Sequence, residues 1–195
     1  MKGLMYIAGS FHTVRRAACG GGMGWIDNDP HFWTQPPTWG ICRNDLRRKA
    51  DPGDYVFFVL PINAKHPQCL FGYLRVAEKI THMAAFQRKA LRRKRMGKRS
   101  PNGNIIVDEF GGYNRFDEGA HHHIFEKVKR EYAVGDLGHS RLLSESEITK
   151  LAPDFLRFLR LLFGKPGARP FDLISRYGRQ LSEHQVQAVL KWVNG

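Results

Sequence analysis

Residues 1–143 contain short apolar runs separated by longer polar or glycine-rich segments, a pattern typical of strands joined by loops. The run at residues 55–60, YVFFVL, is apolar throughout, which predicts a strand buried on both faces. In residues 70–76, LFGYLRV, Gly72 interrupts the alternation and indicates a β-bulge. The runs that predict strands are residues 4–8, 55–60, 70–76 and 105–110, with a further short element at residues 124–128.

The apolar positions of residues 83–96 recur with the period of an α-helix, and the opposite face is cationic. These apolar positions are Met83, Phe86, Ala90 and Leu91. Gly97 and the sequence Ser-Pro-Asn-Gly at residues 100–103 are typical of a helix end. We therefore expect a basic helix followed by a turn.

The C-terminal part of the chain has a helical pattern. Ser144 and Glu147 form a capping box for a short helix, and Pro153 fits the first turn of a second helix. Residues 171–177 predict a third helical piece, and a second capping box at residues 182–185 begins a final helix. Each of the longer helices has one apolar face, so we expect them to cover the β-rich part of the protein.

Together these elements predict an α+β protein with a mixed β-barrel core and a helical C-terminal cap. The length suits a single domain over residues 1–195. Within it we expect a β-rich core from residues 1–82 and 105–143, a basic helix and turn at residues 83–104, and the helical cap at residues 144–195.

The charge balance limits the classes of binding partner that we expect. Thirty-one Lys and Arg residues against eighteen Asp and Glu residues give a net charge of +13, and residues 88–99 contain eight cations and no acid. A field of this kind attracts polyanions, which are DNA, RNA or an anionic membrane. We expect nucleic acid, with DNA favoured over RNA, and the alternative is a basic surface that only keeps the protein in solution.

Cysteine usage and hydropathy indicate the compartment. Cys19, Cys42 and Cys69 are odd in number and widely spaced, which favours a reducing environment over a disulfide framework. No signal peptide is evident, and the longest apolar run, residues 55–62, is too short to span a membrane. We therefore predict a cytoplasmic protein. The glycines at residues 20–24 match neither a phosphate loop nor a dinucleotide fingerprint, so we expect no cofactor.

Three groups of side chains are candidates for contact with nucleic acid. Aromatic rings can stack on an extruded or single-stranded base, arginine forks suit phosphates and guanine edges, and a cationic run suits the backbone. The alternatives are that the rings belong to the core and that the arginines lie on a solvated helix face. The candidates are Trp25, Trp33 and Trp39, then Arg43, Arg47 and Arg48, and then Arg92, Arg93, Lys94 and Arg95.

The sequence gives less support to candidate catalytic and metal-binding residues than to nucleic-acid contacts. His12 and His139 are the histidines that could serve a catalytic site, without a motif around either. Of the histidines at residues 121–123, only His121 and His123 share a face of a strand, and no third ligand has suitable spacing, so we expect no metal site. The sequence also lacks the Glu-x-Lys spacing of a metal-dependent nuclease. Whether the protein is an enzyme stays open.

Residues 36–60, PPTWGICRNDLRRKADPGDYVFFVL, resemble a block found in the nucleotide-modification-associated domains of bacteria and their phages. The matching residues are Cys42, Arg43, Leu46, Arg47, Ala50, Gly53 and Asp54. A looser second block extends from residues 111–113 to residues 138–140, so the resemblance covers residues 4–143, and the basic run at residues 88–99 departs from it. More distantly, GDYVFFV followed by a glycine-containing strand is similar to the PUA-like barrels, which include readers of modified bases.

The resemblance implies a PUA-like core and a DNA-modification context. We therefore expect a nucleic-acid-binding protein that recognises modified or flipped bases in a bacterial or phage setting. Two alternatives stay open: an enzyme that acts on nucleotides or DNA, and an RNA-binding accessory protein without base selectivity. The sequence makes no prediction of oligomeric state.

Overall fold

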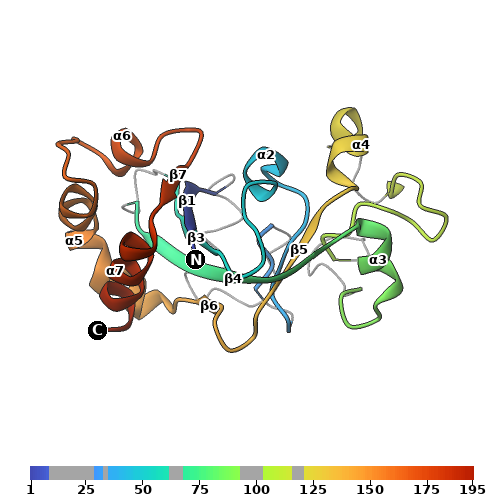
Figure 1. The fold of residues 1–195 in the computed structure, drawn as a ribbon, viewed down its shortest axis with the longest axis horizontal. Coiled ribbons are helices and arrows are strands. Elements are labelled where there is room, and N and C mark those ends of the chain that lie inside the picture. The colour runs from blue at the N-terminus through green and yellow to red at the C-terminus, as the bar shows by residue number, and fades with distance from the viewer. Residues whose placement is uncertain (9–28, 33–34, 62–67, 93–102, 116–120) are drawn as a thin grey trace.

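A mixed sheet with helices at both ends forms the fold (Figure 1). The structure is a computed structural model that describes residues 1–8, 29–32, 35–61, 68–92, 103–115 and 121–195. These residues confirm the predicted α+β class. The strands are β1 (Gly3–Ile7), β2 (Thr38–Trp39), β3 (Tyr55–Val59), β4 (Leu70–Ile80), β5 (Tyr132–Gly135), β6 (Arg141–Leu142) and β7 (Arg179–Leu181).

The long strand β4 connects the two halves of the sheet. Its first half pairs antiparallel with β3 and β6, and its second half pairs antiparallel with β5. The strand order is β2-β5-β4-β3-β1-β7, with β6 attached to β4. Within the described residues β2 and β7 stand at the two ends of this order and do not pair with each other, so the sheet is open. The closed barrel that the sequence predicts is therefore not confirmed.

The strand β3 occupies the centre of the first half. It pairs in parallel with β1 and antiparallel with β4, and all five of its residues are buried, as its continuous apolar run predicts. The pairing of β3 with β4 shifts register beside Gly72, at the position where the sequence indicates a bulge. A Cβ atom on Gly72 would lie 2.9 Å from the carbonyl oxygen of Arg141. Glycine therefore allows β6 to approach β4 closely here.

Three C-terminal helices cover one end of the sheet: α5 (Glu145–Phe163), α6 (Pro170–Ile174) and α7 (Glu183–Asn194). The capping boxes predicted before α5 and α7 are both formed. The prediction of a helix break at Pro153 is wrong, because α5 continues through this exposed residue. The buried residues of α5 stay on one face of the helix from Ile148 to Phe163. The packing of this face outweighs the loss of the one hydrogen bond that proline cannot donate. Within the described residues, no helix has the length and apolarity needed to cross a membrane.

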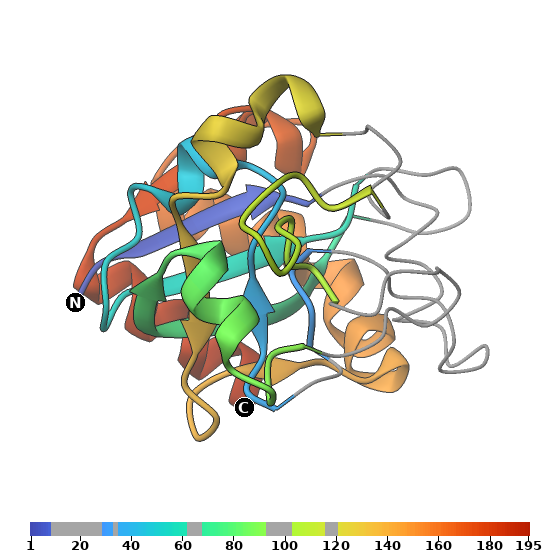
Figure 2. The same ribbon diagram turned by 90° about the vertical axis from the view of Figure 1, so that its right-hand side faces the viewer.

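The opposite end is a small unit that we call the α3–α4 lobe, made of residues 82–92, 103–115 and 121–131 (Figure 2). It contains α3 (His82–Gln87), the 3₁₀ turn η2 (His122–Ile124) and α4 (Phe125–Val128). It packs around a second hydrophobic cluster, separate from the one under α5–α7. The buried members of this cluster are Ala85, Leu91, Ile105, Ile106, Val107, Val128, Tyr132 and Val134.

Two predictions fail in this lobe. The helix predicted over residues 83–96 ends at Gln87, because Arg88 adopts an extended backbone conformation and the chain turns to bury Leu91. Residues 93–96 lie outside the described residues. The strand predicted over residues 105–110 is reduced to a single bridge between Val107 and Tyr113, and a tight turn follows it. The short element predicted at residues 124–128 is present, as helix α4.

We expect Phe155→Ala to lower the free energy of unfolding by about 3–5 kcal/mol, because it removes a fully buried ring of α5 that packs against Trp192 of α7. The matched control is Leu161→Ala on the same helix, where the side chain is 74% exposed and the change should stay within about 0.5 kcal/mol. Urea denaturation of both variants measures the difference. Equal stability of the two would show that α5 does not pack as described.

Candidate functional site

A buried carboxylate, Asp29, lies between the two halves of the protein. Its Oδ1 accepts hydrogen bonds from the backbone N–H of Gly40 at 2.5 Å and from the side-chain amide of Asn104 at 2.7 Å. Its Oδ2 accepts from the backbone N–H groups of Ile41 at 2.6 Å and Cys42 at 2.5 Å. Four N–H donors around two oxygens are the pattern of an ionised carboxylate. Burial raises the pKa of Asp29, and these bonds together with the Arg47 charge oppose that rise.

Asn104 carries the network into the α3–α4 lobe. While its amide nitrogen donates to Asp29, its Oδ1 accepts from the hydroxyl of Thr38 at 3.1 Å and from that of Tyr132 at 2.5 Å. All of these side chains are buried. One amide therefore ties the loop before β2, β2 itself and β5 to the chain segment that opens residues 103–107.

His82, the first residue of α3, completes the network. Its Nδ1 accepts from the backbone N–H of Ile106 at 3.0 Å, so Nε2 carries the proton and donates to the carbonyl oxygen of Gly40 at 2.8 Å. The ring is completely buried and packs edge-on against Tyr132. Burial lowers the pKa of His82 to about 3, and the nearby Arg47 charge acts in the same direction. The imidazole is therefore neutral and structural at physiological pH.

Arg47, the last residue of α2 (Asn44–Arg47), is the buried cation of the same network. Its Nη1 lies 4.0 Å from the Asp29 carboxylate and donates to the carbonyl of Cys42, while its Nε donates to the carbonyl of Glu131. Its Nη2 is buried and has no hydrogen-bond partner among the described residues, as is true of the Trp39 indole N–H. Charge pairing with Asp29 is thus central to keeping this guanidinium in the interior.

Two of the predicted nucleic-acid contacts, Trp39 and Arg47, lie in this interior. The Trp39 ring stacks on Tyr6 at 5.4 Å between centroids and packs edge-on against Phe58, and no part of it is exposed. The Arg47 side chain is fully buried as well. Both residues therefore serve the core of the fold, and neither is available to a nucleic acid at the surface.

The neighbouring arginines differ from each other. Arg43 has a left-handed backbone (φ 53°), and its half-buried side chain pairs with Asp45 in a fork and donates to the carbonyl of Arg176. Its donors are thus largely used within the protein. Arg48 is exposed and remains a candidate contact, with Lys79 donating to its carbonyl.

The other predicted site residues are scattered. Arg92 is exposed, and its guanidinium lies over the Phe86 ring at 5.0 Å. His139 lies on an exposed turn, where its Nδ1 is 3.1 Å from the carboxylate of Asp136. Outside the described residues lie His12, Trp25, Trp33, Arg93, Lys94 and Arg95. The described residues hold no group of three or more His, Cys, Asp or Glu side chains that could bind a metal.

The exposed cations of the α3–α4 lobe form the candidate nucleic-acid interface. Two of the lobe's cations are paired, Arg88 with Glu78 and Lys129 with Glu126. Other cations of the lobe are exposed, and no acid pairs with them among the described residues. We call these the lobe cations: Lys89, Arg92, Lys127 and Arg130.

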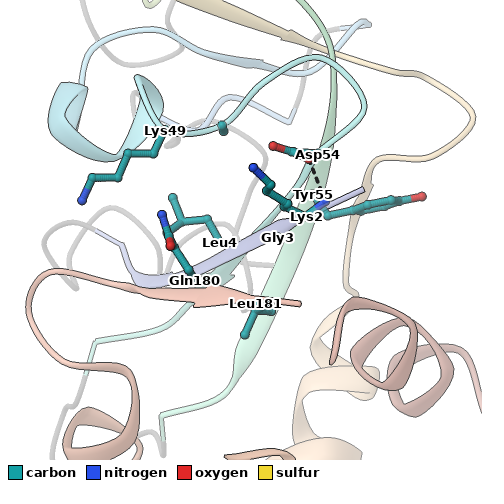
Figure 3. Close-up of a pocket in the computed structure, with 9 residues that line it drawn as sticks. Lys2, Gly3, Leu4, Lys49, Asp54, Tyr55, Gln180 and Leu181 are labelled. Carbon is teal, nitrogen blue, oxygen red and sulfur yellow. Dashed lines mark hydrogen bonds between the residues drawn. The ribbon is translucent and has the colours of Figure 1, made fainter. Parts of the chain in front are cut away.

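A small hollow also opens between β1, β7 and the end of α2, with a volume of about 60 Å³ (Figure 3). Lys2, Lys49 and Gln180 are among its lining residues. The carboxylate of Asp54 is already engaged, because it accepts from the backbone N–H groups of Lys2 and Asp51. The hollow can hold a few water molecules, but it is too small for a nucleobase.

Sequence reasoning missed one exposed residue, Phe110, at the tip of the turn after Val107. The apolar run at residues 105–110 places it at the end of a predicted strand, although the sequence Asp-Glu-Phe-Gly-Gly at residues 108–112 contains a turn signal.

Comparison with protein-family models and with curated proteins finds no match for this chain.

We expect Asp29→Asn to destabilise the fold by about 3–5 kcal/mol, because it leaves the buried Arg47 charge unpaired. It also replaces one acceptor oxygen with an NH₂ group that faces N–H donors. The same change at Asp45, whose ion pair with Arg43 is half-exposed, should cost no more than about 1 kcal/mol. Urea denaturation near neutral pH compares the two variants. A similar small cost at both positions would contradict the role given to Asp29.

His82 predicts a pH dependence. Its folded pKa of about 3 lies below the unfolded value of about 6.5, so the unfolded chain takes up the proton first. The stabilisation is complete above pH ~6.5 and is lost as the pH falls toward 3, by up to about 1.4 kcal/mol per pH unit. The free energy of unfolding should therefore fall between pH 7 and pH 5 in urea titrations.

His82→Gln separates this contribution from other titrating groups. The variant should be less stable at neutral pH and should show a flatter pH dependence over the same range. His123→Gln, at an exposed position, should keep the wild-type slope. A wild-type slope in His82→Gln would assign the acid sensitivity to other groups.

Proposed function

We propose that the protein binds nucleic acid, DNA in preference to RNA, and that the α3–α4 lobe contacts the phosphate backbone. The observation that carries this proposal is the concentration of charge. Residues 82–131 hold twelve of the thirty-one Lys and Arg residues but six of the eighteen acids, a surplus of six out of the net +13. About a quarter of the chain thus supplies nearly half of its excess charge.

The α3–α4 lobe also anchors the chain around the basic run at residues 88–99. Leu91 and Ile105, on either side of residues 93–102, are both buried in its hydrophobic cluster. Both flanks of residues 93–102 are therefore part of a folded unit. Cations at defined positions along a polyanion release counterions together, which gives affinity with a steep dependence on salt. Such contacts position the protein and carry no sequence information by themselves.

The finer parts of the proposal rest on the resemblance of residues 4–143. We propose a PUA-like architecture, supported by the bend of β4, which shares its length between two halves of the sheet. We further propose that the ligands are modified or flipped bases in a bacterial or phage DNA-modification setting. Of the predicted nucleic-acid contacts that lie among the described residues, Arg48 and Arg92 remain exposed.

We expect tight binding to DNA at low salt, with log affinity falling against log salt at a slope of about −5 to −7 if six to eight phosphates are contacted. Replacing both Lys89 and Arg92 with Gln should weaken binding at least tenfold near physiological salt and make the slope shallower by about 1.5–2. Fluorescence anisotropy with labelled DNA and RNA, single- and double-stranded, measures both quantities.

The matched control replaces Lys150 and Arg157 with Gln on the exposed face of α5, which changes the net charge by the same amount at the other end of the molecule. This control should keep nearly the wild-type slope. Equal losses in both double variants would mean that net charge alone attracts DNA. Absence of DNA and RNA binding by the wild-type protein would refute the proposed function.

A further inference from the structure

The turn at residues 108–112 is rigid. Asp108 begins it, and the Asp108 Oδ1 accepts hydrogen bonds from the backbone N–H groups of Phe110 at 3.0 Å and Gly112 at 2.8 Å. The backbone closes the turn from the Asp108 N–H to the Gly112 carbonyl at 3.0 Å, and Gly111 supplies a left-handed φ of 80°. A Cβ on Gly112 would lie 3.0 Å from the Asp108 carboxylate, so a larger residue there would press on the side chain that holds the turn.

The base of the turn is anchored in the α3–α4 lobe. Val107, in the buried cluster, bridges to Tyr113, whose ring packs edge-on against both His122 and Phe125 at centroid distances of 5.0 and 5.3 Å. The Tyr113 hydroxyl also accepts from the backbone N–H of His121. The base of the turn is therefore held against η2 and α4, and α4 carries the lobe cation Lys127, with Arg130 shortly after its end.

Phe110 stands at this tip with 89% of its side chain exposed, the highest value among the exposed large hydrophobic residues of the described chain. The hydrogen bonds of the turn use the backbone of residue 110 and place no demand on its side chain. A turn held this firmly therefore displays an aromatic ring that contributes nothing to the core. Exposing a phenyl ring forgoes the free energy of its burial and leaves the ring face available to a ligand.

We propose that Phe110 stacks on a nucleobase of the DNA that the lobe cations bind, an inference that rests on the proposed function. An exposed aromatic ring in the same lobe as exposed cations suits single-stranded or locally unstacked nucleic acid, because cations can hold the backbone while the ring stacks on a base. Glu109, exposed at the same tip, repels phosphates and favours contact with a base edge over contact with the backbone at this point.

The test compares the wild type with Phe110→Ala in anisotropy titrations with single-stranded DNA. We expect the variant to bind about 5- to 150-fold more weakly, which corresponds to ~1–3 kcal/mol for one stacked base. Its salt slope should equal that of the wild type, because no charge changes. Phe110→Trp should restore binding. Leu161→Ala, a similarly exposed apolar residue at the other end of the molecule, should bind as the wild type does.

Oligonucleotides that contain abasic positions complete the test. If stacking is the interaction, wild type and Phe110→Ala should bind abasic DNA with similar affinity, and a loss that persists there overturns the inference. Equal affinity of the two proteins for normal DNA, with a steep salt slope in both, also overturns it but leaves the proposed function standing. No binding of any nucleic acid by the wild type overturns both.

Discussion

The contact between the Asp29 carboxylate and its donors is the interaction on which the rest of this structure depends. It is formed between two hydrophobic clusters, where apolar packing alone would leave the loop before α2 without partners for its N–H groups. Three consecutive backbone N–H groups, an amide and a buried guanidinium converge on it. A charge in this position is stable only while all of these donors are present, which makes the arrangement all-or-none.

This constraint sets the position of the α3–α4 lobe. The lobe adds few strand pairs to the sheet, since β4 and β5 alone lead into it, yet Asn104 and His82 fix it through hydrogen bonds to Asp29 and to the Gly40 carbonyl. Asn104 precedes Ile105, and the His82 ring packs against Tyr132, and both of these neighbours are buried in the lobe's own cluster. The cationic surface and the turn that carries Phe110 are therefore held at fixed positions relative to the sheet. Rigid placement lowers the entropy cost of engaging a polyanion at several points.

Sequence patterns predicted the elements whose cause is local. The apolar run of β3, the glycine beside the bulge and the two serine capping boxes each depend on a few neighbouring residues, and all are present. Errors arose where distant contacts decide the outcome. The basic helix ends early because Leu91 turns into a cluster built by residues far along the chain, and α5 continues through Pro153 because its apolar face is needed against the sheet. The short strands β2 and β7 have too few residues for a periodic signal.

The same reasoning changes the meaning of the block at residues 42–54. Leu46 and Ala50 are in the core, Arg47 neutralises Asp29, Gly53 supplies a positive φ, and the Asp54 carboxylate caps backbone N–H groups of the turn and of β1. Nearly every member thus has a structural role in this fold, and these roles account for the block without a ligand. Functional specificity has to come from parts of the chain that depart from the block, and the cationic lobe with its exposed ring is such a part.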